Sequence, residues 1–371
     1  MFNAAEVSEK IKFKMRAVAA RNTANIPYTA VDGRFDDRGA NDICWWTNGF
    51  WGGMMWQLYH ATKEPLYLEI AERTEVKLDA ALNSAQGMDH DSGFRWMPTA
   101  VANYRLNANL HAKNRALLAA TNLAGRFNSA GRFIRAWNDG GDGNNAGWAI
   151  IDCMMNLPLL YWAWGETKDP RFYHIATMHA DTARKYFIRA DGSAKHIVTF
   201  DPKTGDYQKS LGGQGYRHGS SWTRGQAWAI YGFTLSYLYT GEVEYLKTAI
   251  AVADYFVSKI PVNGYIPVDF RQPKEYTWED DSAAAIAACG LLELAEAAED
   301  DHYKAAAIRM LDALCEDGAN LDEDTDQILE RCSAAFHEES HEYPIIYGDY
   351  FFIEAIFKLT GEEFPIWYVE E

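Results

Sequence analysis

Apolar and polar positions along this chain recur in a pattern that predicts paired helices. The first helix of each pair is apolar on nearly all sides, which indicates burial, and a short acidic or Gly turn leads to an amphipathic second helix. The copies lie at Gly52–Tyr67, Leu157–Tyr173, Ala229–Tyr245 and Ala284–Tyr303, with a less regular one at Val101–Phe127 and a half copy at Phe351–Glu362.

Counting these copies gives about six helical hairpins, close to the unit size of helical repeats. Six inner and six outer helices predict an all-α fold, an (α/α)6 barrel of six helical hairpins. An open solenoid of the same hairpins is the alternative. No Gly/Ser-rich or Pro-rich linker interrupts the pattern, so residues 1–371 are expected to form a single (α/α)6-barrel catalytic domain. Strand-like runs are few, which disfavours a parallel sheet.

The segments that lead into the buried helices have the most unusual composition. They are rich in Trp, Gly, Asp, Asn and His, whereas the turns at the opposite ends are ordinary Thr-Gly-Glu sequences. In a closed ring all inner helices start at the same end, so these segments converge. Rigid aromatic residues with a few polar groups are typical of small-ligand sites. We expect one aromatic-lined pocket at one mouth, built from Asp42–Gly53, Asp89–Met97, Trp137–Ile151, His196–Trp228 and Tyr276–Ser282.

Charge and cysteine usage narrow the class of partner. The 371 residues carry a formal net charge of −17, which disfavours nucleic acid and anionic membranes. A small anionic ligand is compatible with it, because charges beyond about 8 Å are largely screened. No segment reaches the roughly 18 apolar residues of a membrane span, and residues 1–10 lack a signal-peptide pattern. Five scattered cysteines without a C-x-x-C pair fit a reducing compartment, so we expect a cytoplasmic monomer or weak homodimer.

Asp152 is a charged residue inside an apolar run, between Ala146–Ile151 and Cys153–Leu160. Loss of solvation favours the neutral form of a carboxyl and raises its pKa. A carboxyl that is neutral near pH 7 can donate a proton, so Asp152 is a candidate general acid. The structural alternative is a cap of the following helix, a position that Asp favours.

Two further loops offer aromatic and acidic side chains. Asp42–Gly53 holds three Trp and three Gly, which suits a stacking wall for a sugar ring or, alternatively, core packing with tight turns. Asp89–Phe94 holds two carboxylates and a His. One of these carboxylates is expected to partner Asp152, because carbohydrate chemistry repeatedly needs one acidic and one ionised group. A metal site is the weaker alternative, since no second His cluster follows at ligand spacing, and we expect no metal and no cofactor.

Gln214–Trp228 is the most specific string in the chain, with two Arg, one His, two Gln and two Trp in fifteen residues. Arg suits a carboxylate ligand, because its planar fork donates two parallel hydrogen bonds. For Arg224 the structural alternative is a helix-end role or pairing with an Asp.

These strings resemble the unsaturated glucuronyl hydrolases of glycoside hydrolase family 88. Five motifs carry the resemblance, in the family's order and over nearly the whole chain: Trp46–Trp51, Asp89–Phe94, Ile150–Leu160, Ser221–Trp228 and Tyr347–Phe352. Members of that family are (α/α)6 barrels, which agrees with the hairpin count. The resemblance implies removal of a Δ4,5-unsaturated uronic acid from the non-reducing end of lyase-generated oligosaccharides, such as chondroitin or hyaluronan disaccharides. The reaction is hydration of the C4=C5 enol ether rather than attack on the glycosidic bond.

The resemblance also implies roles for single residues. Asp152 matches the family's general acid/base, and Asp91 matches its second essential Asp. Protonation of C4 by Asp152 builds a cation across C5 and the ring oxygen. Asp91, which lies in a more polar turn, would be ionised and would stabilise this cation. Water then adds at C5, directly or with help from the substrate's 2-hydroxyl, and the resulting hemiketal opens. Ring-stacking and polar substrate contacts match Trp46, His90, Trp137, His196, Gln214, Trp222 and Trp228, and Arg224 lies within the same motif.

The chain also departs from the family pattern. His337–Pro344 is acidic and holds no Lys, where members that prefer sulfated chondroitin carry a Ser and Lys cluster, so a strong sulfate preference is not expected unless Lys209 or Arg217 substitutes. Residue 48 is Asn where some relatives have Asp. The rival functions are an unsaturated rhamnogalacturonyl hydrolase acting on pectin fragments and a sugar epimerase, which would need paired His bases. A non-catalytic sugar-binding module would not need Asp152.

Overall fold

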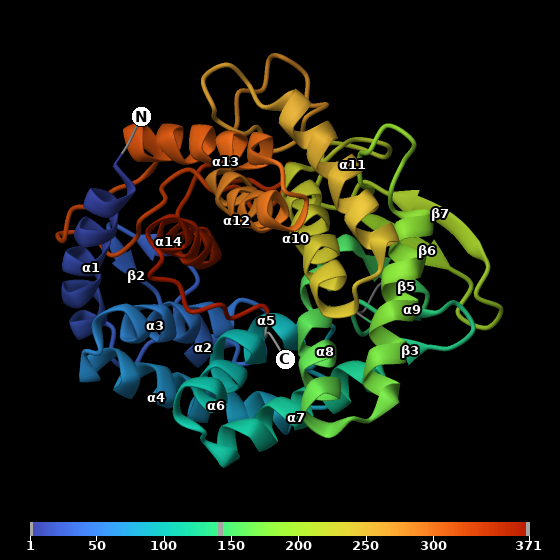
Figure 1. The fold of residues 1–371 in the computed structure, drawn as a ribbon, viewed down its shortest axis with the longest axis horizontal. Helices are drawn as coiled ribbons and strands as arrows, with labels where there is room; N and C mark the ends of the chain where they lie inside the picture. Colours follow the sequence, from blue (N-terminus) through green and yellow to red (C-terminus); the bar gives the residue numbers. More distant parts are fainter. Residues whose placement is uncertain (1–2, 140–143, 369–371) are drawn as a thin grey trace.

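Helices form two concentric rings in the computed structural model, which describes residues 3–139 and 144–368 (Figure 1). The inner ring consists of α3 (Asn48–Thr62), the run of α5 (Ser92–Trp96), η1 (Met97–Val101) and α6 (Ala102–Asn107), α8 (Leu157–Thr167), α10 (Thr223–Thr240), α12 (Asp281–Ala297) and α14 (Ile346–Thr360). The outer ring consists of α1 (Ala4–Arg21), α4 (Pro65–Leu82), α7 (Leu110–Gly125), α9 (Pro170–Tyr186), α11 (Val243–Lys259) and α13 (Asp301–Ala313). The predicted all-α (α/α)6 barrel is confirmed.

The ring is closed by helices from the two ends of the chain rather than by a sixth contiguous hairpin. The half copy at Phe351–Glu362 is the inner helix α14, and it packs against the inner helix α3 and the outer helix α1 (Figure 1). Lys12 of α1 donates to Glu362 at 2.5 Å, and Arg21 pairs with Asp326 at 2.7 Å. The prediction of six hairpins is therefore right in helix number but wrong in connectivity, and the open solenoid is excluded.

Left-handed residues end the inner helices and turn the chain outward. Lys63, Ala108, Lys168, Gly241 and Gly361 occupy the C-cap positions of α3, α6, α8, α10 and α14, each with φ between 53° and 72°. Such a cap stops a helix within one residue. The outer partners start at once, several of them with Pro in the first turn or an Asp or Asn cap, and this explains the repeated acidic turns of the sequence.

Short antiparallel strands decorate the helical rings. β1 (Ala30–Val31) pairs with β2 (Arg34–Phe35), and β3 (Phe127–Asn128) pairs with β4 (Phe133–Ile134). A three-stranded sheet joins β5 (Trp148–Ile150), β6 (Ile197–Phe200) and β7 (Tyr207–Leu211), with Ala149 opposite Val198. No parallel pair occurs among the described strands, as predicted. Short helical turns complete the chain at α2 (Arg38–Asn41), η2 (Ile151–Met155) and η3 (Leu314–Gly318).

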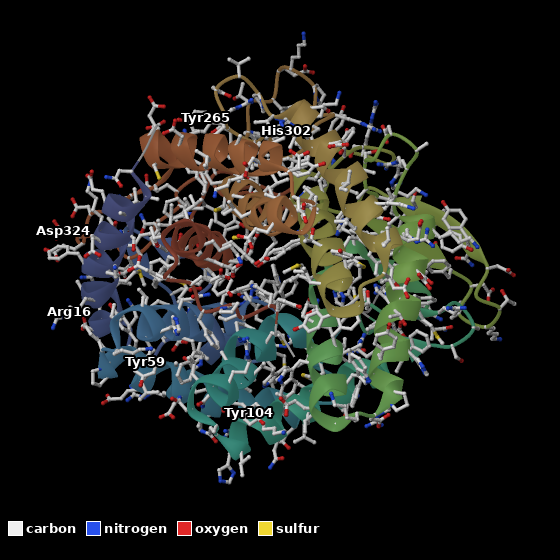
Figure 2. All side chains as sticks on the ribbon, in the orientation of Figure 1. Arg16, Tyr59, Tyr104, Tyr265, His302 and Asp324 are labelled. Atoms are coloured by element: carbon white, nitrogen blue, oxygen red, sulfur yellow. The ribbon has the colours of Figure 1, made fainter. Side chains whose placement is uncertain are left out.

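Side chains fill the space between the ribbons, while Arg16 and Asp324, both labelled in Figure 2, lie at the outer edge near α1. Trp51, Trp56, Trp96 and Trp228 are fully buried in one continuous core. An aromatic side chain of this size buries roughly 150–250 Å², which at about 25 cal/mol per Å² contributes about 4–6 kcal/mol. A rigid core of this kind fixes where the inner helices begin. No helix in the described part of the chain is long and apolar enough to cross a membrane.

Candidate active site

The predicted site residues gather where the inner helices begin. Asp91 directly precedes α5, Asp152 lies in η2 before α8, and Trp222 is the N-cap residue of α10. The pairing of β5 with β6 adds His196, whose carbonyl oxygen accepts a hydrogen bond from Ile151 at 3.1 Å. The expected convergence of the loops is confirmed, although residues 140–143 of the segment Trp137–Ile151 lie outside the described residues.

The carboxyl of Asp152 is buried and is not neutralised by a cation in contact. It is 8% exposed, and its Oδ2 atom has no hydrogen-bond partner among the described residues. Burial raises the pKa of Asp152 to about 7, against the opposing effects of the Arg224 charge and the Trp228 side chain. The capping alternative is wrong, because Asn156, four residues later, occupies the N-cap position of α8. The environment is that of a proton donor near neutral pH.

Asp91 lies in buried surroundings, not in the more polar turn that the sequence suggested. It is 6% exposed and accepts a hydrogen bond from Nδ2 of Asn156 at 3.1 Å. Burial and the charges of Asp89 and Asp152 raise the pKa of Asp91 well above its usual value, while Arg95 and Asn156 oppose the rise. The loop is covered because Gly93 lies against the first turn of α8: a Cβ atom on Gly93 would sit 2.4 Å from Cα of Asn156.

Two neutral histidines lie beside the two carboxyls. Burial lowers the pKa of both His90 and His196 to about 3. Nδ1 of His196 accepts the backbone N–H of Gln214 at 3.0 Å, so its ring proton is on Nε2, which lies 3.6 Å from Oδ2 of Asp152. Nε2 of His90 lies 3.3 Å from Oδ1 of Asp91. Each predicted carboxyl therefore has an uncharged imidazole as its neighbour.

The four predicted tryptophans fall into two classes. Trp46 and Trp137 are partly exposed, and their rings contact Tyr347 at 5.0 Å and Trp148 at 6.2 Å between centroids. Trp222 and Trp228 are 2% and 0% exposed, so their rings belong to the core. The core-packing alternative was raised for the loop Asp42–Gly53, where it describes Trp51, which is 0% exposed; Trp222 and Trp228 were expected to contact substrate. Trp222 still contacts His196, at 4.4 Å between ring centroids, and Trp228 adjoins Asp152.

Arg224 is the clearest correction among the predicted ligands. It is 1% exposed, and its Nη1 atom donates to Asp280 and to the carbonyl oxygen of Ser333, both at 2.7 Å. Nη2 donates to the carbonyl oxygen of Ala334. The Asp-pairing alternative is therefore the one that the structure shows. Instead of presenting a free fork to a ligand, Arg224 supplies a fixed positive charge that lowers the pKa of Asp152.

A sixth loop, residues 319–345, contacts the site; the sequence linked its stretch His337–Pro344 to sulfate preference but did not predict its contact with Gln214. Nε2 of Gln214 donates to the carbonyl oxygen of Ala334 at 2.7 Å, and the backbone N–H of Phe336 donates to the carbonyl oxygen of Gln214 at 2.8 Å. Gln214 is thus tied to the segment that precedes α14. Asn156 and Tyr347 were also missed as site residues. The available signal for Asn156 was a polar residue inside the same apolar run as Asp152.

The acidic loop at Asp89 is engaged by a cation of the protein itself. Asp89 pairs with Nη2 of Arg95 at 2.6 Å, which explains how two carboxylates two residues apart are tolerated. Within residues 3–139 and 144–368, no three His, Cys, Asp or Glu side chains are grouped as a metal ion requires.

The sequence profile of Glycosyl Hydrolase Family 88 matches residues 15–344. The chain belongs to this family. The family 88 relatives include an unsaturated glucuronyl hydrolase of Bacillus sp. (strain GL1), 37% identical over 339 residues, covering 88% of this chain and 89% of the relative. An unsaturated chondroitin disaccharide hydrolase of Streptococcus pyogenes serotype M1 is 33% identical over 332 residues, covering 87% of this chain and 83% of the relative.

Solved family 88 structures share the whole architecture. The crystal structure of the unsaturated glucuronyl hydrolase from Bacillus sp. GL1 has a TM-score of 0.91 and 33% identity, covering 97% of this chain and 99% of that one. A variant of such an enzyme with dGlcA-Glc-Rha-Glc also has a TM-score of 0.91 and 33% identity, with 98% of both chains covered. This family 88 chain is therefore a glycoside hydrolase.

Proposed function

We propose that this enzyme removes the Δ4,5-unsaturated uronic acid from the non-reducing end of lyase-generated oligosaccharides by hydrating the C4=C5 bond. One observation carries the proposal: the buried Asp152 carboxyl, with its unpartnered oxygen and a pKa of about 7. Such a group is half protonated at neutral pH and can donate to carbon. The names of the relatives support the same substrate class, because they are unsaturated glucuronyl and chondroitin disaccharide hydrolases. They do not favour the pectin-fragment alternative.

The reaction starts with a proton transfer from Asp152 to C4. The π electrons of the C4=C5 bond form the new C4–H bond, and positive charge spreads over C5 and the ring oxygen. Asn156 and the charge of Arg95 favour the ionised form of Asp91 against the effect of burial, and the ionised carboxylate stabilises that cation. Two buried carboxyls that interact bind one proton between them near neutrality, which gives one acid and one anion.

Water completes the cycle at C5. Its oxygen bonds to C5, and its proton returns to Asp152, which restores the acid. The hemiketal at C5 opens to a ketone and leaves a hemiacetal at C1, whose collapse releases the shortened sugar. Nε2 of His196, a donor facing Asp152, and the partly exposed rings of Trp46 and Trp137 hold the unsaturated sugar during these steps.

Finer features of the substrate and the setting follow from charge. Residues 337–340, next to Phe336, are exposed and include Glu338 and Glu339, which favours unsulfated or lightly sulfated disaccharides over heavily sulfated ones.

All five cysteines are unpaired, which supports a reducing cytoplasm. The net charge of −17 supports a small anionic sugar rather than nucleic acid or a membrane surface as the partner. A monomer or weak homodimer, measurable by light scattering, suffices because every proposed site residue comes from one chain.

The test is the loss of ultraviolet absorbance of the conjugated C4=C5 bond in unsaturated chondroitin and hyaluronan disaccharides. The wild-type enzyme should bleach this absorbance, and Asp152→Asn should abolish the bleaching while the fold survives. Asp349→Asn is a matched control, because burial raises the pKa of Asp349 to about 7 too, yet its oxygens accept Ile328 and Leu329 N–H groups. Activity retained in Asp152→Asn would refute the acid assignment.

A further inference from the structure

We infer that Asn156 is a positioning residue that keeps the negative charge on Asp91 and thereby leaves the transferable proton on Asp152. The inference rests on the proposed function and adds to it the device that divides the two roles between the carboxyls. Nothing in the family resemblance assigned a role to this side chain.

The orientation of the Asn156 amide is fixed by a hydrogen bond at each end. Its Oδ1 accepts the backbone N–H of Phe94 at 2.9 Å. Its Nδ2 therefore faces the other way, where it donates to Oδ1 of Asp91 at 3.1 Å and lies 3.5 Å from the carbonyl oxygen of Asp152. Since an N–H group cannot accept, the site offers Asp91 a donor at this oxygen. A donor stabilises a carboxylate more than a carboxylic acid.

Asn156 forgoes the bond that its position in the helix would normally make. It occupies the N-cap of α8, where an Asn side chain usually accepts an N–H group of the first turn. No such capping bond forms, and the side chain instead crosses to the loop before α5 and to Asp91. The residue is 0% exposed, so its two bonds are made away from water. This arrangement sacrifices local helix stability for contact with a carboxyl.

Each carboxyl has a positive charge that lowers its pKa, Arg95 for Asp91 and Arg224 for Asp152, so these two cations do not separate the roles. Oδ2 of Asp152 has no hydrogen-bond partner among the described residues, whereas Asp91 has the Asn156 donor. Asp91 is buried beside a second acid, so without a donor it would compete with Asp152 for the proton. The ionisable groups that act on Asp91 or that it acts on are Asp89, His90, Arg95, Arg126, Asp152 and Cys153.

The experiment compares pH profiles of kcat. Asp91 must be ionised for activity, so its protonation makes kcat fall at low pH and produces the acid limb of the profile. Removal of its hydrogen-bond donor raises the pKa of Asp91 and moves this limb to higher pH. In Asn156→Ala we expect an upward move of about one pH unit, the effect of losing one charge-assisted hydrogen bond. Asn156→Asp, nearly isosteric and still an acceptor for Phe94, should move the limb in the same direction. It also covers the case that the Ala variant fails to fold.

Asn103 supplies the matched control. This residue of α6 is 1% exposed, and its side chain donates to the carboxylate of Glu75 on α4 at 2.8 Å. Asn103→Ala should lower Tm without moving the limb. If the acid limb of folded Asn156→Ala or Asn156→Asp stays within about 0.3 pH unit of wild type, Asn156 is only structural and the inference fails.

A second readout does not depend on turnover. The carboxyl carbon of Asp91 is followed by ¹³C NMR in protein labelled at aspartate, with Asp91→Asn for assignment and no substrate present. Its titration midpoint should rise in both Asn156 variants. If the wild-type enzyme bleaches no unsaturated disaccharide, the proposed function fails, yet this titration still decides whether Asn156 controls the charge of Asp91.

Discussion

Asp152→Asn is expected to stabilise the folded protein at alkaline pH while it removes catalysis. The pKa of this carboxyl rises from 3.8 to about 7 on folding, and burial is the main cause. Below pH 3.8 the group is protonated in both states and costs nothing. Between pH 3.8 and 7 the unfolded chain releases the proton and the folded protein retains it, so the free energy of unfolding falls as pH rises, and above 7 the loss is complete.

The magnitude follows from the size of the shift. Roughly three pKa units at about 1.4 kcal/mol each give a cost of at most about 4 kcal/mol at pH 8, and roughly 1.5 kcal/mol at pH 5. An Asn at position 152 never ionises and avoids this cost. Its buried amide nitrogen offsets part of the gain, but equally at both pH values. The diagnostic quantity is therefore the difference between pH 8 and pH 5, about 2–3 kcal/mol.

Urea unfolding of wild type and Asp152→Asn at the two pH values measures this difference. Asp269→Asn is the control, because Asp269 is a fully buried carboxylate that accepts bonds from Tyr216, Ser220 and Ser221. Its replacement should destabilise the protein at both pH values. A stability gain of Asp152→Asn that is equal at pH 5 and pH 8, or a loss at pH 8, would refute the reasoning.

Four further outcomes are expected. Arg224→Met leaves a buried acid unpaired and should lower the free energy of unfolding by about 3–5 kcal/mol, against less than about 1 kcal/mol for the exposed ion pair removed by Lys247→Ala; equal losses in urea would contradict this. Trp46→Ala should raise KM for the disaccharide about tenfold with little change in Tm, whereas Trp228→Ala should chiefly lower Tm. The reverse pattern would contradict the division into partly exposed substrate-facing rings and buried core rings. Dialysis against a chelator should leave the rate unchanged, and a loss restored by a divalent cation would reopen the metal alternative. Initial rates should be higher with an unsulfated than with a sulfated disaccharide, and Glu338→Lys should lower the ratio of these two rates. An unchanged ratio would show that residues 337–340 do not influence substrate choice.

The sequence predicted features that depend on local pattern. The apolar run around Asp152 correctly indicated a buried carboxyl, because neighbours in sequence are its neighbours in space. The composition of the loops located the site at the start of the inner helices for the same reason. Asp91 was misjudged, because the cover over its turn comes from Asn156, which lies 65 residues further along the chain.

Long-range partners account for the other misses. Arg224 reads as a free cation in sequence, but it pairs with Asp280 and with carbonyl groups more than 100 residues away. The split pair of α14 and α1 has no local signature either, since its two helices stand at opposite ends of the repeat pattern. Such contacts are set by ring closure, and only the folded structure reveals them.

The split pair has a consequence for how the protein is made. Lys14 of α1 donates to the carbonyl oxygen of Asp322 and to Thr325, both more than 300 residues further along the chain. Its neighbour α14 ends at Thr360, so α1 leaves the ribosome long before this partner exists. The side of α1 that packs against α14 stays uncovered until residues 346–360 have been synthesised. A nascent chain stalled before α14 therefore contains the five contiguous hairpins but still exposes the α14-facing side of α1 to chaperones.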